Sequence, residues 1–409
     1  MIELREAKDF VVSDLEALGV QEASLDEALG CALGVDVVAR EQVPGFANSS
    51  MDGFALRGAE TSAAPTRLRI VDSIFAGQVS SLELGPGEAM RIMTGASIPA
   101  GADAVCPVED VVVEGSDVVI SRMVQPGDSV RRAGGDVQVG QLLLSAGAEL
   151  TPAAIGVLAG QGFASVLVHR RPVVGVLSTG DELALTTDEL APGQIRDSNR
   201  PLLLALLRSS GFDAVDLGVV ADGYEDIKRR ISEAAHHCDA VVSTGGVSMG
   251  DVDFVKGVIT ELSAGGARTM QIAIKPAKPF AFGRVGAAQT PVFGLPGNPV
   301  STRVSFELFV RPALRILGGH RHIERLEVQA ILDIELATPR DEKLHLVHVV
   351  ASMGDDGRLH VTDAAAHFSH LLSAIVGCNA IAKLVPGHSY GIGDSVRAMV
   401  LDADSLAPR

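Results

Sequence analysis

Residues 173–183 read VVGVLSTGDEL, an apolar run that leads into a short polar turn containing glycine. No charged or hydrogen-bonding side chain interrupts the run over 173–177. Strands without polar alternation are typical of a parallel sheet that helices cover on both faces. The segment therefore predicts a buried strand, with the turn STGDEL placed at one edge of such a sheet.

The same alternation of apolar strands and amphipathic helices continues to the glycine pair at 318–319. Ser198 is expected to cap the first of these helices, which stops at Gly211. Interleaved strands and helices predict a doubly wound α/β domain. Further strands are expected at 215–220, 240–243, 271–274, 280–282 and 292–295, and further helices at 225–236 and 299–317.

The remaining chain has two other patterns. Residues 1–40 are predicted to be helical, because apolar side chains recur at helical spacing between Phe10 and Leu18 and because Ser24 can cap a second helix. Short apolar runs separated by Gly, Pro and Asp predict strands elsewhere. The predicted domains are a discontinuous helical linking domain (1–40 plus 142–170), a β-rich lobe (41–141), the α/β domain (171–318) and a C-terminal barrel or sandwich (319–409).

The charge balance of the 409 residues argues against nucleic acid as a partner. There are 34 Lys and Arg against 51 Asp and Glu, a net charge of −17, whereas a duplex-binding protein needs a basic face. No apolar run approaches the ~20 residues of a membrane helix, and the charged N-terminal segment has no signal-peptide core. The four cysteines form no CxxC pair. We therefore expect a cytoplasmic protein with reduced thiols and no membrane partner.

Three glycine-containing loops follow strands of the predicted sheet: STGDEL (178–183), STGGVSMGDVD (243–253) and GLPGNPVS (294–301). One such loop is what any short connection requires, but three at one sheet edge favour a ligand site. Glycine lets backbone N–H groups approach a ligand closely. The candidate binding residues are Ser178, Thr179, Gly180, Asp181, Ser243, Gly245, Gly246, Ser248, Gly250, Pro296, Gly297, Asn298 and Pro299.

Charged residues accompany these loops. Carboxylate oxygens suit a hard cation such as Mg²⁺, although carboxylates at helix starts also balance the helix dipole. Lys275 and Lys278 follow a strand, where they can meet an anion or remain solvated. Together these groups are typical of a magnesium-assisted nucleotide or phosphate site, without a Walker or GxGxxG pattern. The acidic residues in question are Asp181, Glu182, Asp251 and Asp253.

Three polar segments of the N-terminal half have an ordinary explanation when each is taken as a bare string. Residues 44–55 and 91–105 have the composition of turns. Residues 130–136 place Arg131 and Arg132 beside a carboxylate, which exposed ion pairing explains.

Taken in order along the chain, however, seven segments resemble the MoeA family of molybdopterin molybdenumtransferases, which also forms the C-terminal part of gephyrin. The match spans nearly the whole chain. The segments are NSSMDGFALR (48–57), RIMTGASIPAGADAV (91–105), STGDEL (178–183), GQIRDSNR (193–200), STGGVSMGDVDFVK (243–256), KPAKPFAFG (275–283) and GLPGNPVS (294–301).

The resemblance implies a fold and a reaction. The family has an interrupted helical segment, a β-rich lobe, a molybdopterin-binding α/β domain and a C-terminal β-barrel. Its reaction inserts molybdenum from molybdate into adenylated molybdopterin, requires Mg²⁺ and releases AMP, as a late step of molybdenum cofactor biosynthesis. The resemblance further implies a homodimer that makes transient contacts with other cofactor-biosynthesis proteins. In that dimer the β-rich lobe reaches across, so that one site uses two chains.

The resemblance also assigns site residues. Lys278 would join the residues that bind the pterin substrate. Glu182, Asp222 and Asp253 would bind the metal. The catalytic residues that it implies are Asp52, Thr94, Arg131, Asp136, Glu182, Asp222, Asp253 and Lys275.

The chain departs from the family pattern at four positions. Ala47 replaces an Asp, Gln271 a Lys, Ala277 the glycine of KPGKP, and His348 an Arg. Two of these changes, Gln271 and His348, replace a basic residue by a neutral one and would weaken anion binding. Two alternatives to the molybdenum insertase therefore stay open at this stage. One is a non-catalytic molybdopterin-binding or scaffolding protein of the gephyrin type, and the other is an insertase that prefers tungstate.

Overall fold

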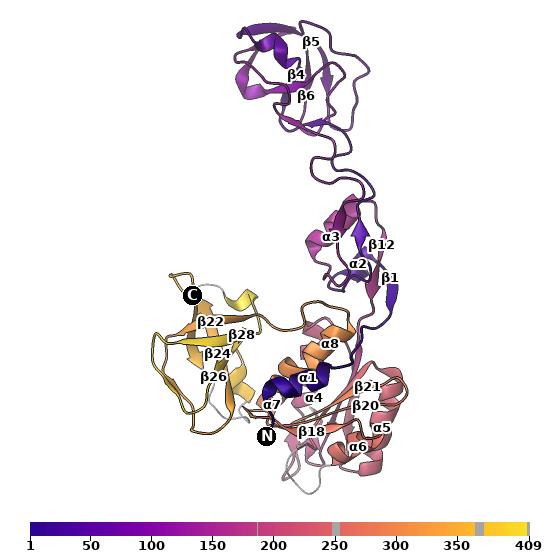
Figure 1. The fold of residues 1–409 in the computed structure, drawn as a ribbon, viewed down its shortest axis with the longest axis vertical. Coiled ribbons are helices and arrows are strands. Elements are labelled where there is room, and N and C mark those ends of the chain that lie inside the picture. The colour runs from indigo at the N-terminus through magenta and orange to yellow at the C-terminus, as the bar shows by residue number, and fades with distance from the viewer. Residues whose placement is uncertain (186, 248–253, 365–371, 407–409) are drawn as a thin grey trace. The chain divides into compact units, whose positions relative to one another are not determined.

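The computed structural model describes residues 1–185, 187–247, 254–364 and 372–406. The chain divides into two compact units, which are distinguishable in Figure 1. This division is coarser than the four predicted domains, whose boundaries remain a prediction. The large unit comprises Met1–Gly34, Gly147–Thr151 and Val166–Arg409, and the small unit comprises Val35–Ala146 and Pro152–Ser165.

A six-stranded sheet with the order β16-β13-β17-β21-β20-β18 forms the centre of the large unit. Four of its strands, from β16 to β21, are parallel, but β20 is antiparallel to both of its neighbours. The prediction of a parallel sheet is therefore wrong at one edge. The connection 286–289 between β20 and β21 is too short for the crossover that a parallel pair needs. The strands are β13 (Val173–Thr179), β16 (Asp213–Val220), β17 (Ala240–Thr244), β18 (Arg268–Gln271), β20 (Pro279–Val285) and β21 (Thr290–Leu295).

Helices cover both faces of this sheet, as the uninterrupted apolar strands predict (Figure 1). On one face α1, α4, α7 and α8 pack with side chains such as Val176 and Phe293. On the other face α5 and α6 pack with side chains such as Leu177 and Val292. The elements are α1 (Leu4–Val12), α4 (Asn199–Ser209), α5 (Tyr224–His237), α6 (Phe254–Leu262), α7 (Pro299–Ser305), a π-helical turn η3 (Phe306–Val310) and α8 (Arg311–Leu317).

Two cap predictions have different outcomes. Ser24 caps α2 (Leu25–Ala28) as predicted: its Oγ accepts the N–H of Glu27 at 3.4 Å, and the Glu27 carboxylate accepts the N–H of Ser24 at 3.1 Å. The side chain of Ser198 does not cap α4. Instead Asp197 Oδ1, one residue earlier, accepts the N–H of Arg200 at 3.2 Å. The carboxylate of Asp197 therefore caps the helix, instead of the hydroxyl of Ser198.

The prediction that residues 1–40 are helical is wrong in part. Val20–Ser24 forms strand β1, which pairs with β12 (Ser165–His169). Because the partner strand lies far along the chain, no local pattern indicates this pairing. The first helix, predicted over Glu3 to Leu18, ends already at Val12.

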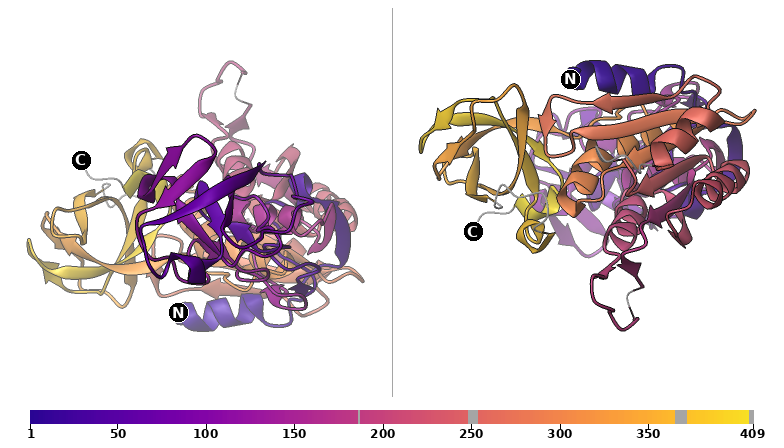
Figure 2. Two further views of the ribbon diagram at one scale, coloured as in Figure 1. Left: turned by 90° about the horizontal axis from the view of Figure 1, so that it is seen from above. Right: turned by 90° about the horizontal axis from the view of Figure 1, so that it is seen from below.

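The C-terminal strands form a five-stranded barrel (Figure 2). Its order is β24-β25-β22-β28-β26, and it closes because β26 also pairs with β24. Small aliphatic side chains such as Ala330, Val349 and Ala382 fill its interior. Its elements, with the short strands and turns beside it, are β19 (Ile274–Lys275), β22 (Glu327–Leu332), β23 (Leu336–Ala337), β24 (Leu344–Met353), β25 (Leu359–Ala364), η4 (Leu372–Ile375), β26 (Ala380–Leu384), β27 (Ser389–Tyr390), β28 (Ser395–Val400) and η5 (Asp404–Leu406).

The small unit is built on a second six-stranded sheet, with the order β7-β4-β6-β5-β9-β8. Two apolar clusters fill its two faces, one around Phe54 and one around Met90. Its elements are β2 (Val37–Val38), β3 (Asn48–Ser49), β4 (Gly53–Leu56), η1 (Gly58–Thr61), β5 (Thr66–Ile74), β6 (Glu88–Ile92), β7 (Ala104–Pro107), η2 (Val108–Asp110), β8 (Val111–Glu114), β9 (Asp117–Ile120), β10 (Val130–Arg131), β11 (Leu142–Leu144) and α3 (Pro152–Gly160).

Two properties of the whole chain bear on its environment. Within the described residues, no helix combines the length and the apolar composition that crossing a membrane requires. Cys31, Cys106, Cys238 and Cys378 are all buried and free, as predicted for reduced thiols. Burial raises the pKa of the Cys106 thiol to about 11, so this side chain stays a neutral core group.

Candidate functional site

The connections of the large sheet place a switch point between β13 and β17. The chain leaves β13 for β16 on one side and then crosses back to β17 on the other side. Loops that diverge in this way leave a crevice at the carboxyl ends of the strands, which is where doubly wound sheets bind ligands. Loop 180–182 follows β13, the segment from 245 follows β17, and loop 296–298 follows β21. The three predicted loops therefore meet at one edge of one sheet.

Glycine is required where the first two loops touch. Gly245 has φ +94°, and a Cβ atom there would lie 2.5 Å from the carbonyl oxygen of Thr179. Gly246 has φ +64°, and its Cβ would lie 2.6 Å from a methyl group of Val255. Both the backbone conformation and the close contact exclude a side chain. The two glycines thus allow the loops after β13 and β17 to pack directly against each other.

Asn199 joins the second loop to the third. Its side-chain amide nitrogen donates to Thr244 Oγ1 at 2.9 Å and to the carbonyl of Gly297 at 2.6 Å. A second hydroxyl supports the third loop, because Thr302 Oγ1 donates to the carbonyl of Pro296 at 2.7 Å. All three side chains are buried, so each of these bonds fixes a loop rather than a solvated surface.

Buried polar atoms at this edge lack protein partners. In the part of the chain that the structure describes, Thr179 Oγ1, Ser243 Oγ and Asn199 Oδ1 accept or donate no hydrogen bond. Leaving a buried polar atom unpaired costs about 1–3 kcal/mol, so folded proteins rarely tolerate it. Thr179 and Ser243 lie at the ends of two neighbouring strands and Asn199 lies at the start of α4, so polar atoms without a protein partner occur close to the predicted loops.

Acidic side chains lie at the same edge. The backbone N–H of Asp222, which follows β16, donates to Asp181 Oδ1 at 3.0 Å, and Glu182 is next in the chain. All three are exposed. Across the described ranges, no three Asp, Glu, His or Cys side chains form a ready group for a metal ion. Asp253, the third predicted metal ligand, lies outside the described residues, together with Ser248, Gly250 and Asp251.

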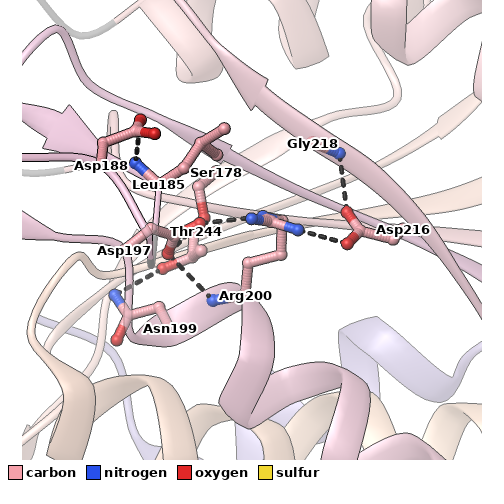
Figure 3. Close-up of polar contacts among 9 residues, drawn as sticks. All are labelled: Ser178, Leu185, Asp188, Asp197, Asn199, Arg200, Asp216, Gly218 and Thr244. Carbon is pink, nitrogen blue, oxygen red and sulfur yellow. Dashed lines mark hydrogen bonds and ion pairs between the residues drawn. The ribbon is translucent and has the colours of Figure 1, made fainter.

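A buried arginine joins the segment before α4 to strand β16 (Figure 3). Arg200 Nε donates to Asp197 Oδ2 at 2.9 Å, and its Nη1 donates to Asp216. Asp197 Oδ1 in turn accepts the hydroxyl of Ser178 at 3.0 Å. Burial lowers the pKa of the Arg200 guanidinium, but the bonds to Asp216 and Asp197 outweigh it, and the net effect is a raised pKa. Arg200 therefore keeps its charge.

The two predicted lysines lie at the matching end of the sheet. Because β20 is antiparallel to β21, with Ala281 opposite Gly294, the start of β20 lies where β21 ends. Lys278 immediately precedes β20, and Lys275 lies on β19 with its side chain exposed. Between them Ala277 has φ +70°, a conformation that favours glycine, the residue that the family pattern is expected to have here.

The small unit brings together two of the predicted residues. Asp52 Oδ1 accepts both the backbone N–H and the hydroxyl of Thr94, each at 2.7 Å. These bonds, with the backbone one first, lower the pKa of the Asp52 carboxyl. Both residues are exposed, so an ionised carboxylate faces solvent.

Arg131 and Asp136 lie in different places of the small unit. Arg131 lies on β10 opposite Asn48, and the adjacent Ser49 of β3 bonds to the Thr94 turn through the N–H of Gly95 at 2.8 Å. Strand β3 thus lies between the Arg131 strand and the Thr94 turn. Asp136 lies on a separate exposed turn, where its backbone N–H donates to the carbonyl of Val43 at 2.9 Å.

His348, the residue expected where the family pattern has an arginine, is buried on β24. Burial, and then the nearby charge of Arg303, lower the pKa of its imidazole to about 3. The side chain is therefore neutral at ordinary pH. Burial also lowers the pKa of the Arg303 guanidinium. At this place the chain thus has a neutral imidazole next to a guanidinium that comes from α7.

Sequence reasoning missed the residues that hold the loops. They are Asp197, Asn199, Arg200, Asp216, Thr244 and Thr302. A usable signal was present for two of them, because Asn199 and Arg200 begin a helix that is otherwise rich in leucine. A polar pair at the start of a buried helix indicates partners in the interior.

Comparisons with known proteins agree with this picture. A family model described as "MoeA N-terminal region (domain I and II)" matches residues 2–162, and one described as "Probable molybdopterin binding domain" matches residues 175–316. The molybdopterin molybdenumtransferase of Haemophilus influenzae is 36% identical over 88% of each chain. That of Bacillus subtilis is 34% identical over 92% of this chain and 89% of its own.

A solved structure is similar over the full length. The molybdopterin biosynthesis moeA protein of Pyrococcus horikoshii has a TM-score of 0.82 and 27% identity, and the match covers 98% of this chain and 100% of that one. The predicted multidomain fold, with its α/β domain, β-rich lobe and C-terminal barrel, is confirmed. The motifs that suggested the family are confirmed as well, and the chain belongs to the MoeA family of molybdopterin molybdenumtransferases.

Proposed function

We propose that the protein inserts molybdenum from molybdate into adenylated molybdopterin and releases AMP, as a late step of molybdenum cofactor biosynthesis. The observation that carries the proposal is the meeting of three glycine-containing loops at the switch point of the large sheet. Near these loops, buried oxygen atoms of Thr179, Ser243 and Asn199 have no hydrogen-bond partner among the described residues. Relatives that cover most of the chain are named molybdopterin molybdenumtransferase, which supports the pterin as the ligand of these loops.

Both proposed substrates are anions, so the site must offset negative charge in a chain of net charge −17. Backbone N–H groups of the glycine loops can bind phosphate oxygens without adding charge. Lys275 and Lys278 add two positive groups at the end of the sheet where β21 terminates. The scarcity of aromatic residues, at 4%, fits a ligand held by amides and charge more than by stacking.

We propose Mg²⁺ as the cofactor, with Glu182, Asp222 and Asp253 as its protein ligands. The described part of the site offers the kind of donor that this ion takes, because Glu182 and Asp222 are exposed carboxylates on two loops that the bond from the Asp222 N–H to Asp181 Oδ1 joins. Mg²⁺ in phosphate-binding sites takes one or two carboxylates and fills its other positions with water and substrate oxygens. When bound, Mg²⁺ would offset phosphate charge at the reacting group.

The remaining proposed catalytic residues lie in the small unit and at the end of β19. Thr94 favours the ionised form of Asp52, which suits that carboxylate to orient a reacting group. Arg131 and Lys275 would stabilise negative charge. The full set comprises Asp52, Thr94, Arg131, Asp136, Glu182, Asp222, Asp253 and Lys275.

The test is a reconstituted insertion assay. Purified protein receives adenylated molybdopterin, Mg²⁺ and either molybdate or tungstate, and AMP and active cofactor are measured. We expect molybdate-dependent AMP release, and we expect Asp52→Ala and Asp222→Ala each to abolish it while the fold remains intact. Asp117→Ala is the matched control, because Asp117 is a surface carboxylate of the small unit that pairs with Arg67. Pterin binding without any AMP release in the wild type would instead indicate a binding or scaffolding protein.

We also propose that the protein works as a homodimer in which residues of both chains serve one reaction. Mixed dimers of the Asp52→Ala and Asp222→Ala chains test this directly. If the two residues act from different chains, each mixed dimer has one intact site and one doubly altered site. Activity should then recover to about a half of the wild-type value in pure mixed dimers, and to about a quarter in a random mixture. No recovery in verified mixed dimers would contradict the proposal.

We place the activity in the cytoplasm. The four cysteines are free and buried, which is typical of a reducing compartment. Fractionation of cells that express the protein checks this, and recovery outside the cytoplasmic fraction would overturn it.

A further inference from the structure

Arg200 is a buried cation in the second position of α4. It is 8% exposed, and the helix continues with leucines that pack into the core. Its guanidinium bonds to two aspartates that lie on different segments, Asp197 before the helix and Asp216 on β16. A buried arginine is costly unless its donors are satisfied. The other hydrogen bonds of the two aspartates therefore show which parts of the chain Arg200 supports.

The Asp197 branch ends at the first glycine loop. The Asp197 side chain is 2% exposed, and its Oδ2 accepts Arg200 Nε at 2.9 Å. Its Oδ1 accepts the Ser178 hydroxyl at 3.0 Å. Ser178 is the last residue but one of β13, immediately before the loop that carries Asp181 and Glu182. The charge of Arg200 thus favours the ionised Asp197 that holds this hydroxyl.

The Asp216 branch ends at the segment before Asp222. Asp216 Oδ1 accepts the N–H of Gly218 at 2.8 Å. The register between β13 and β16 shifts here, because Val176 lies opposite Asp216 but Ser178 lies opposite Val219. One extra residue of β16 therefore forms a bulge that the aspartate stabilises. Bulges beside active sites set the direction of the chain that follows them.

The two branches meet again beyond the strands. The N–H of Asp222 donates to Asp181 Oδ1 at 3.0 Å, so the loop after β13 and the loop after β16 touch. Arg200 bonds both to Asp197, which accepts the Ser178 hydroxyl, and to Asp216, which accepts the N–H of Gly218 (Figure 3).

We propose that Arg200 is a positioning residue that holds Ser178 and the chain before Asp222 in one fixed relation. The proposal rests on the proposed function, because it assigns Arg200 to the site that would hold the pterin and the Mg²⁺ ligands. Arginine is required because its planar fork reaches two carboxylates on different segments at once. A lysine ammonium in the same place can satisfy only one of them well.

The chain contains a matched arginine pair at the opposite end of the same sheet. Arg170 bonds to both oxygens of Asp239, with Nη1 to Oδ2 at 2.7 Å, and Asp239 also accepts the N–H of Val173 at 2.8 Å. This pair supports the start of β13, whereas Arg200 supports its end. Arg170→Lys therefore serves as a control that weakens an arginine–aspartate pair of the same sheet away from the site.

Steady-state kinetics and hydrogen exchange test the proposal. We expect Arg200→Lys to lower kcat for AMP release by about tenfold or more, because misplaced reacting groups slow the chemical step, with KM changed less than about threefold. We also expect faster amide exchange at 178–184 and 217–223. Arg170→Lys should leave kcat and both segments unchanged. Equal behaviour of the two variants would overturn the proposal.

A second pair of variants covers the case that Arg200→Lys does not fold. Asp216 is half-exposed, so changes there leave the core intact. Asp216→Asn keeps an acceptor for Gly218, and Asp216→Ala removes it. We expect the Ala variant to lose activity and to show faster amide exchange at 217–223. We expect the Asn variant to keep most of its activity and to show amide exchange close to that of the wild type. If the wild type shows no turnover, the proposed function fails, while the exchange pattern still decides whether Arg200 fixes the two loops.

Discussion

Replacing Gly245 with alanine tests the contact between the first two loops. At φ +94° an alanine costs about 1–2 kcal/mol in backbone conformation. Its Cβ would also lie 2.5 Å from the carbonyl oxygen of Thr179, which belongs to a central strand and cannot move aside. Relieving such an overlap costs about 1–3 kcal/mol. We therefore expect Gly245→Ala to lower the free energy of unfolding by about 2–5 kcal/mol.

Gly297→Ala is the matched control in the third loop. A Cβ at Gly297 meets only the Cα of Gly245, at 3.8 Å, which is an ordinary contact. Gly297 is also exposed. We expect the free energy of unfolding of the Gly297→Ala variant to stay within about 0.5 kcal/mol of that of the wild type. A loss of pterin affinity in this variant would then report how closely the ligand approaches the loop.

Urea denaturation followed by circular dichroism measures both variants, and fluorescence of the bound pterin measures affinity. A fall in the urea midpoint for Gly245→Ala alone is the expected result. Equal midpoints for the two variants would refute the reasoning, because they would mean that the loops do not pack as closely as the structure places them.

Two further predictions concern titration. Thr94→Val removes one donor to Asp52, so the pKa of that carboxyl should rise and the acid limb of the activity profile should move to higher pH, whereas Thr94→Ser should not move it. His348 has a folded-state pKa of about 3 against an ordinary value of 6.5, so the unfolded chain takes up a proton first as the pH falls. Stability should therefore be complete above 6.5 and fall toward 3, and His348→Gln should flatten this dependence in urea titrations at several pH values. An unchanged acid limb in Thr94→Val, or parallel stability curves for His348→Gln and the wild type, would contradict the respective prediction.

Much of the α/β part of the fold is predictable from the sequence because its strands are buried on both faces. Val173–Thr179, Ala240–Thr244 and Thr290–Leu295 each contain an unbroken apolar run that needs helices on either side. The antiparallel pairing of β20 follows only from the length of the 286–289 connection, which apolar patterning ignores. Strand β1 depends on a partner at Ser165–His169 and has no local signature.

The sequence predicts the glycine-containing loops of the candidate site, but it does not predict the buried hydrogen bonds that hold these loops. Glycines at fixed places in three βα turns are visible in the sequence, and a shared sheet edge follows from the topology. The sequence does not show the partners of Arg200. Asp197 is three residues away, but Asp216 lies on strand β16, beyond the end of α4. Such a bond depends on the register of β16 and on its bulge, which only the folded chain defines.

The reconstituted assay tests the central claim most directly. Wild-type protein is mixed with adenylated molybdopterin, Mg²⁺ and molybdate, and AMP is measured together with cofactor that activates a molybdenum-free molybdoenzyme. The account predicts AMP and active cofactor in the wild type, and neither in the Asp52→Ala or Asp222→Ala protein. Absence of both products in a wild-type protein that is folded and binds the pterin would contradict it.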